Sequence, residues 1–128
     1  MKNVLLVLLT LLFVNGCGST GKQNMQQQEL LHLIELKQAP AIIDVRSESE
    51  YLSGHVPGAI HVPFWATFSP SELENREPSD LLVLYCQHGP RAGIAKLALS
   101  LSGFKNIIYL EGHMSSWLSA ALPIEKNE

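Results

Sequence analysis

A single cysteine at the end of an apolar run is the strongest candidate for chemistry in this chain. Cys86 follows the run 81–85, and Arg91 closes the segment Cys-Gln-His-Gly-Pro-Arg. A strand that passes through a short glycine-containing loop into a helix points backbone N–H groups, and the positive helix end, at whatever lies over the loop. We expect this field, with the charge of Arg91, to lower the pKa of the Cys86 thiol. The pattern therefore predicts a nucleophilic thiolate.

The alternative for one cysteine is a buried, inert side chain at a strand end. The order of the neighbouring elements favours function over this alternative. An apolar run, a loop with glycine and arginine, and a helical pattern follow one another, and the apolar positions of that pattern are Ile94, Leu97, Ala98 and Leu101.

The first sixteen residues have the composition of a signal peptide. Lys2 precedes the apolar stretch 4–14, which is shorter than the roughly 18 apolar residues of a membrane-spanning helix. Residues 14–17, Val-Asn-Gly-Cys, resemble a bacterial lipobox, in which cleavage before the cysteine leaves Cys17 lipid-modified. Asn15 differs from the usual small residue at its position, so ordinary signal-peptidase cleavage near Gly16 is the alternative. Either route predicts export to the periplasmic side of the cell envelope.

Size and charge limit the organisation of the exported chain. Removing residues 1–16 from 128 leaves 112 residues, enough for one domain. We expect a lipidated cysteine and flexible tether over residues 17–24 and the folded domain over residues 25–128. A lipid anchor would make the membrane a partner, the outer membrane if the organism has one. Twelve acidic residues outnumber the basic ones, which are scattered, so nucleic acid is not an expected partner.

The two cysteines of the chain do not predict a disulfide. A lipidated Cys17 is unavailable for a bridge, which leaves Cys86 as the only thiol of an exported protein. An unpaired thiol is a liability in an oxidising compartment unless it has a function.

Strands and helices alternate along the chain. We predict strands over 41–45, 60–62, 81–85 and 107–110, and helices between Asn24 and Pro40 and over 47–54, 91–102 and 113–120. This order favours an α/β domain with a mainly parallel central sheet flanked by helices. Because ligands bind at the carboxyl ends of such strands, segments 44–46, 86–91 and 111–113 are expected to meet around Cys86.

Two motifs in this framework resemble the single-domain rhodanese (sulfurtransferase) family over residues 29–122. The first comprises Asp44-Val45-Arg46, Glu50-Tyr51 and residues 54–63, and the second comprises residues 85–92 with Gly103-Phe104, residues 110–112 and Trp117. The resemblance implies a rhodanese-like three-layer fold. It also implies that the Cys86 thiolate takes sulfane sulfur from thiosulfate or a similar anionic donor. The acceptor would be a thiol, cyanide or a thiol-bearing protein.

The loop is expected to bind the persulfide through its backbone, as an oxyanion hole binds an oxyanion. The expected donors are the N–H groups of Gln87, His88, Gly89, Arg91 and Ala92. Pro90 has no N–H, and its fixed φ suits the start of the following helix.

Other polar residues are expected to support the site. By resemblance, Asp44 and Arg46 form an ion pair that braces the loops, and His55 stabilises a turn. His88 either attracts the anionic donor or faces solvent without a role. The dipeptide 112–113, Gly-His, departs from the Gly-Gly that is usual here in the family, which alters the rim of the pocket.

Two rival functions are left open. Cysteine-dependent phosphatases and arsenate reductases of this fold also use a Cys-to-Arg loop, but theirs is one residue longer, and acids for a leaving group are limited here to Asp80 and Glu111. A non-enzymatic sulfur carrier or binding module is the second rival. We expect no cofactor and no metal site, since none of the histidines has ligand spacing with Cys86.

Overall fold

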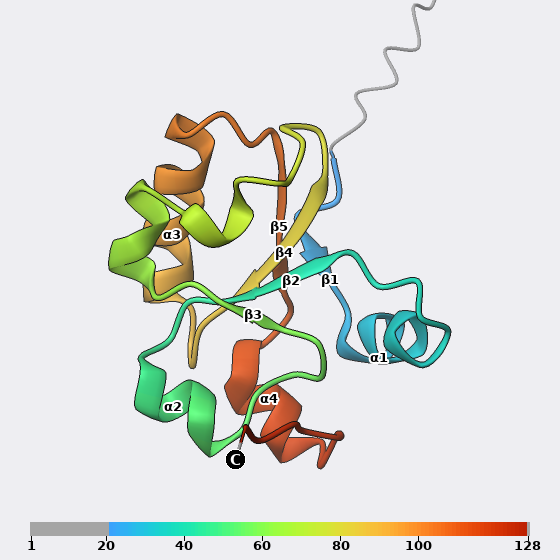
Figure 1. The fold of residues 1–128 in the computed structure, drawn as a ribbon. Helices are drawn as coiled ribbons and strands as arrows, with labels where there is room; N and C mark the ends of the chain where they lie inside the picture. The colour runs from blue at the N-terminus through green and yellow to red at the C-terminus, as the bar shows by residue number, and fades with distance from the viewer. Residues whose placement is uncertain (1–20, 128) are drawn as a thin grey trace, which may run out of the picture.

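A computed structural model of the protein describes residues 21–127 and contains one five-stranded sheet. The strands are β1 (Asn24–Met25), β2 (Ala41–Asp44), β3 (Ile60–His61), β4 (Leu81–Tyr85) and β5 (Asn106–Leu110), in the order β1-β5-β4-β2-β3 (Figure 1). Every pairing between these strands is parallel. The central strands are aliphatic along most of their length, as expected for strands that are covered on both faces.

Helices cover both faces of the sheet and make three layers. They are α1 (Gln27–Glu35), α2 (Glu48–Ser53), α3 (Pro90–Leu101) and α4 (His113–Ser119), with two 3-10 helices, η1 (Phe64–Phe68) and η2 (Ser71–Leu73). α3 and the 3-10 helices lie on one side of the sheet, and α1 and α4 lie on the other (Figure 1). The predicted α/β, three-layer architecture is confirmed.

Successive residues of each central strand serve opposite cores. In β2 and β4, Ile43 and Leu84 pack toward α3, whereas Ile42 and Val83 pack toward α1 and α4. This alternation follows from the two-residue period of a strand. Trp117 of α4 is fully buried in the second core, and its indole N–H donates to the Pro123 carbonyl at 2.8 Å.

The start of α2 forms as its sequence predicts. The Ser47 hydroxyl accepts from the Glu50 N–H at 3.3 Å, and the Glu50 carboxylate accepts from the Ser47 N–H at 2.9 Å, which completes a capping box. Gly54 ends the helix with a φ of +146°. Residues other than glycine rarely adopt this conformation.

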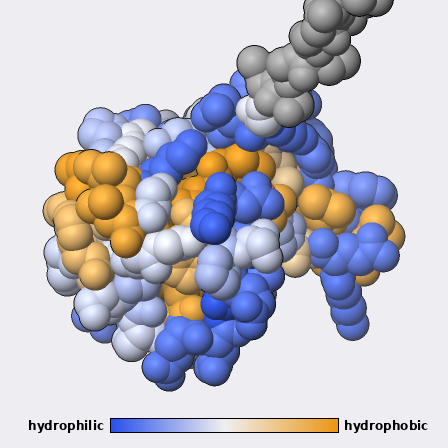
Figure 2. Space-filling model, turned by 90° about the horizontal axis from the view of Figure 1, so that it is seen from above, coloured by the Kyte–Doolittle hydropathy of each residue, from blue (hydrophilic) through white to orange (hydrophobic). Residues whose placement is uncertain are grey.

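The buried face of α3 differs from the expected one. Ile94, Leu97 and Leu101 are 46–77% exposed, and the buried residues are Ala92, Ala95, Ala98 and Leu99. Small alanines let the helix approach the sheet closely, and the larger side chains then face outward. The apolar area on the left of Figure 2 lies on the α3 side of the molecule.

The beginning of the domain also differs from the sequence interpretation. Asn24, assigned to the tether and to a helix cap, lies in β1 and pairs with Tyr109 of β5. The N-cap residue of α1 is Gln26, whose side chain makes no capping hydrogen bond. A two-residue edge strand has too little periodicity to be recognised from sequence. The predicted signal peptide and Cys17 lie outside the described residues.

The topology brings three chain segments together at one end of the sheet. β2 ends at Asp44, β4 at Tyr85 and β5 at Leu110, and these ends lie at the same edge because all the strands are parallel. Cys86 follows β4 directly, and His113 lies three residues after the end of β5. Among residues 21–127, no helix is long and apolar enough to span a membrane.

A substitution in α1 tests the second core. Leu30 is fully buried, so Leu30→Ala is expected to lower the free energy of unfolding by about 2–5 kcal/mol, through lost burial and the cavity left behind. Leu36, next to the same helix, is 50% exposed, and Leu36→Ala is expected to change stability by about 0.5 kcal/mol or less. Urea unfolding of both variants measures the difference. Equal effects would contradict the described packing of α1.

Candidate active site

The Cys86 side chain lies under a loop that wraps back toward it. The Gly89 N–H donates to the Cys86 sulfur at 2.9 Å, and Cys86 is only 1% exposed. Gly89 has a φ of +134°, which glycine adopts without strain. It is also the residue before Pro90, the first residue of α3, so the chain turns from the cysteine directly into the helix.

Hydrogen bonds to the sulfur overcome the effect of burial on its ionisation. Burial alone raises the pKa of the Cys86 thiol. The His113 side chain and the N–H groups of Ala92, Gly89 and His88 stabilise the thiolate and lower the pKa from 9.0 to about 7. A substantial fraction of Cys86 is therefore the nucleophilic thiolate at neutral pH.

The first turn of α4 braces the loop from the other side. The Met114 N–H donates to the Cys86 carbonyl at 3.0 Å, and the Ser115 N–H donates to the Gln87 carbonyl at 3.1 Å. The Cys86 N–H in turn donates to Nδ1 of His113 at 3.2 Å. These bonds fix the first two peptide groups of the loop against α4.

A buried ionic network fixes the end of the sheet beside the loop. The Asp44 carboxylate accepts from Arg46 Nη2 and from the Tyr85 hydroxyl, each at 2.7 Å, and from the Arg46 N–H at 2.9 Å. Arg46 also donates to the Gly54 carbonyl at 2.8 Å and to the Gln87 side chain at 3.3 Å. Asp44 and Arg46 are buried, so the network links β2, β4, α2 and the loop.

Arg91 is held by a carboxylate from α2. Its two terminal nitrogens donate to the two Glu50 oxygens at 2.6 and 3.0 Å. The hydrogen bond from Arg91 is the main reason that the pKa of Glu50 falls to about 2. The guanidinium also interacts electrostatically with the charge of Cys86. Arg91 therefore contributes to the electric field at the sulfur while it is bound to Glu50.

The histidines named from the sequence occupy different positions. His55 is buried, stacks on Tyr51 at 3.8 Å between ring centroids, and its Nδ1 lies 2.9 Å from the Tyr51 carbonyl. These contacts attach the His55 ring to Tyr51 of α2. The His88 side chain is exposed, whereas its backbone N–H is among those that stabilise the thiolate.

Comparison with known proteins identifies the family. Residues 26–120 match the rhodanese-like domain family, which is most of the chain. The chain belongs to the rhodanese-like family. A thiosulfate:glutathione sulfurtransferase of Saccharomyces cerevisiae is 32% identical over 89 residues, which cover 61% of this chain and 64% of that protein. An uncharacterized protein of Synechocystis is 37% identical over 98 residues, which cover 75% of this chain and 54% of that protein.

Solved structures show the same rhodanese-like fold. A rhodanese-related protein from Thermoplasma volcanium superposes with a TM-score of 0.68 at 25% identity, over 82% of this chain and 99% of that one. A rhodanese-like domain from Anabaena superposes with a TM-score of 0.72 at 23% identity, over 84% and 81% of the two chains. The chain spans just over half the length of the Synechocystis protein and just under two thirds of the length of the yeast protein. The relatives place it among proteins of the sulfurtransferase or sulfur-carrier kind.

Two residues of the rhodanese-like site were not identified as functional candidates from the sequence. Glu50 was interpreted only as part of a capping box and a family motif, yet it also holds Arg91 across 41 positions of sequence. His113 belongs to the segment 111–113 that is expected to meet Cys86 and replaces a common glycine, but its contact with the backbone of Cys86 is not predicted from the sequence. An unusual side chain beside the reactive segment was the available signal for His113, whereas the Glu50 contact depends on the fold.

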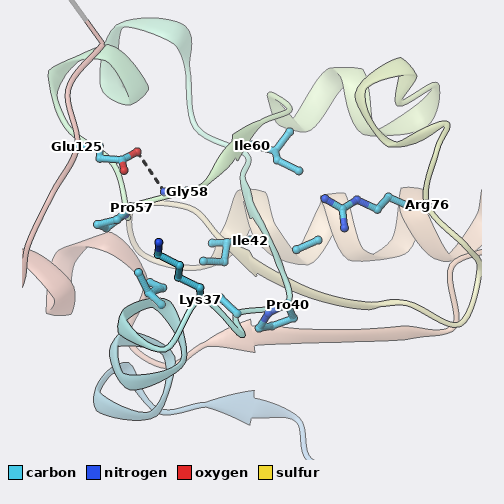
Figure 3. A pocket seen from close by; sticks show the side chains of 11 residues that line it. Lys37, Pro40, Ile42, Pro57, Gly58, Ile60, Arg76 and Glu125 are labelled. Atoms are coloured by element: carbon cyan, nitrogen blue, oxygen red, sulfur yellow. Dashed lines mark hydrogen bonds between the residues drawn. The ribbon is translucent and has the colours of Figure 1, made fainter.

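A pocket of about 400 Å³ lies elsewhere on the rhodanese-like domain (Figure 3). Ala41 and Ile60, the first residues of β2 and β3, line it, so it opens at the amino ends of those strands, away from Cys86. Glu125 at its rim accepts from the Gly58 N–H at 3.1 Å. Within residues 21–127, no group of three or more His, Cys, Asp or Glu side chains is arranged to hold a metal ion.

The ion pair between Glu50 and Arg91 predicts a pH-dependent contribution to stability. The pKa of Glu50 is about 2 in the folded protein, below its ordinary value of 4.5. The stabilisation is therefore complete above pH 4.5 and is lost as the pH falls toward 2. At pH 7, Glu50→Gln is expected to lower the free energy of unfolding by about 0.5–1 kcal/mol, and the difference from wild type is expected to shrink at pH 3.

Urea unfolding at pH 7 and pH 3 measures this difference. Glu48→Gln is the matched control, because Glu48 lies in the same first turn and is exposed. A difference between wild type and Glu50→Gln that stays constant with pH would contradict the assignment of the ion pair.

Proposed function

We propose that this protein is a sulfurtransferase that carries sulfane sulfur as a persulfide on Cys86. The observation that carries the proposal is the Gly89 N–H at 2.9 Å from the Cys86 sulfur, at a loop whose N–H groups lower the thiol pKa to about 7. Membership of the rhodanese-like family supports it. So does the similarity to the yeast thiosulfate:glutathione sulfurtransferase, whose name states both a donor and an acceptor.

The reaction has two displacement steps. The Cys86 thiolate attacks the sulfane sulfur of thiosulfate, the sulfur–sulfur bond of the donor breaks, and sulfite leaves with the electron pair. The new persulfide anion has its charge on the terminal sulfur. In the second step an acceptor thiolate or cyanide attacks that sulfur, and Cys86 leaves as the thiolate. No cofactor takes part, and each step leaves the total charge unchanged.

The loop supports both steps through hydrogen bonding. In this proposal the N–H groups of His88, Gly89 and Ala92 stabilise the anion on Cys86 before and after it gains sulfur. Besides the N–H expected from the sequence, Gln87 has two further contacts, because its side chain accepts from Arg46 and its carbonyl accepts from α4. Gln87 therefore positions the loop.

Arg91 supplies positive charge near the sulfur and attracts the anionic donor. Because its guanidinium is bound to Glu50, part of that charge is neutralised. Cys86 and Arg91 enclose four residues, one fewer than in the cysteine-dependent phosphatases, so the phosphatase alternative has less support. The alternative of a passive sulfur carrier has the same persulfide chemistry without turnover, and an assay of turnover separates it.

We also propose export and lipid anchoring through the N-terminal segment. The charged start, the apolar stretch and the lipobox-like residues 14–17 support this proposal. Two or more acyl chains on Cys17 would give stable membrane binding. Sulfur transfer would then take place at the surface of a membrane of the cell envelope.

Intact-mass analysis tests the sulfur-transfer proposal. Freshly reduced wild-type protein is expected to gain one sulfur atom when it is incubated with thiosulfate and to lose it again on addition of cyanide. Cys86→Ser is expected to gain none, because the pKa of a serine hydroxyl is too high for it to act as a nucleophile here. The Cys86→Ser protein also serves as the control for sulfur bound elsewhere.

Turnover assays separate the rival functions. Sulfite released from thiosulfate in the presence of cyanide is expected for wild type, and phosphate released from an aryl phosphate is not. A protein that acquires the sulfur but does not turn over is a carrier. Phosphate release without any gain of sulfur mass would overturn the proposal.

The mature N-terminus tests the export proposal. Expression in a bacterium is expected to give a membrane-bound protein that begins at a lipid-modified Cys17, and an inhibitor of lipoprotein signal peptidase is expected to accumulate the precursor. Cys17→Ser is expected to lose the lipid and leave the membrane fraction. A soluble wild-type protein that begins at another residue would refute lipid anchoring.

A further inference from the structure

His113 has a backbone conformation that is costly for its residue type. Its φ is +55°, and the preceding Gly112 has a φ of +72°, so two successive residues adopt the left-handed conformation. Glycine adopts this conformation without strain, whereas a histidine does so at a cost. Strained residues of this kind persist where the surrounding structure fixes them and are frequent at functional sites. The contacts of the imidazole indicate which function this strained backbone could serve.

The imidazole lies against the cysteine loop on two sides. Nδ1 accepts from the Cys86 N–H at 3.2 Å. Nε2 lies 3.4 Å from the position that a side-chain carbon would take on Gly89, the residue whose N–H donates to the sulfur. His113 is therefore between the backbone of the nucleophile and the turn of the loop, and it is only partly exposed.

These contacts select one form of the ring. A nitrogen that accepts a hydrogen bond has no proton, so the Cys86 N–H bond assigns the acceptor role to Nδ1. The proton of the neutral ring is then on Nε2. The Nε2–H side of the ring thus lies beside Gly89, whose own N–H donates to the sulfur, and hydrogen bonding from His113 favours the charged form of Cys86.

Other titratable groups also face this site and stay the same when His113 is changed. Arg91 of α3 interacts with the charge of Cys86, and Glu50 of α2 is bound to Arg91. From β5, Tyr109 lies 5.9 Å from the His113 ring between centroids, and Lys96 of α3 is over the Tyr109 ring at 4.8 Å. The effect of His113 is therefore measured against a constant charged background.

We propose that His113 is a further catalytic residue, whose Nε2–H donates to the Cys86 sulfur and holds it as an anion before and after it takes up sulfur. For the persulfide, this inference rests on the proposed sulfur-transfer function. For the free thiolate of Cys86, it holds whether or not the protein transfers sulfur. The competing interpretation is structural, since His113 also satisfies the Cys86 N–H. A test has to remove the Nε2–H and keep that acceptor.

His113→Asn makes this separation. An asparagine amide oxygen can accept from the Cys86 N–H as Nδ1 does, but the side chain does not reach the position of Nε2. Asparagine also tolerates the left-handed conformation better than histidine. His113→Gly removes both groups and relieves the strain, so neither variant is expected to unfold more easily than wild type in urea.

The pH dependence of Cys86 alkylation by iodoacetamide is the main measurement. The wild-type midpoint is expected near the thiol pKa of about 7, and both His113→Asn and His113→Gly are expected to raise it by about one pH unit. His32→Asn is the matched control, because His32 is exposed on α1 far along the chain from the loop. A wild-type midpoint in His113→Asn would show that His113 only accepts from the backbone, and would overturn the proposal.

Nitrogen NMR of the His113 ring gives a second, independent measurement. A protonated Nε2 and a bare Nδ1 are expected in the wild-type protein, and the reverse tautomer would overturn the proposal. Neither measurement needs sulfur transfer. If wild type shows the midpoint shift on mutation but never gains sulfur from thiosulfate, the proposed function fails while the donor role of His113 stands.

Discussion

A buried carboxylate at the end of β2 holds the surroundings of the reactive loop together. Asp44 binds three donors of Arg46 and the hydroxyl of Tyr85, and the Arg46 side chain continues to the Gly54 carbonyl and to Gln87. Two strands, the end of a helix and the loop thus share one ionic network. Removing one partner of such a buried pair leaves an uncompensated charge, at a cost of about 3–5 kcal/mol. The loop is therefore held rigidly against the end of the sheet.

This rigidity matters because the loop acts through its backbone. N–H groups stabilise an anion best when their direction is fixed in advance, since no reorganisation is then needed during the reaction. The positive φ of Gly89 turns one N–H onto the sulfur, and α4 binds the carbonyls of Cys86 and Gln87 from behind. Arg91 adds charge, but Glu50 fixes its direction. Sheet, helix and ion pairs each constrain one side of the same short loop.

The sequence was sufficient where local chemistry decides the structure. The capping box at Ser47, the aliphatic strands, and the Cys86 loop between a strand and a helix could all be predicted from residue type and spacing. It was insufficient where tertiary packing decides. The two-residue strand at Asn24 forms only because β5 lies beside it, and the outward-facing leucines of α3 follow from close packing of its alanines. The pairing of Glu50 with Arg91 likewise exists only in the fold.

The balance of forces on Cys86 suits the two roles that the proposed sulfur transfer gives its thiol, nucleophile and leaving group. Burial opposes the thiolate and the surrounding donors favour it, and the resulting pKa is about 7. A thiol with a much lower pKa would be ionised completely but would be a weaker nucleophile, and one with a much higher pKa would be a poorer leaving group. In the proposed reaction, attack on the donor and departure from the outer sulfur place opposite demands on the pKa of Cys86. A pKa near the ambient pH meets both demands, and it requires the opposing contributions of burial and hydrogen bonding that this loop combines.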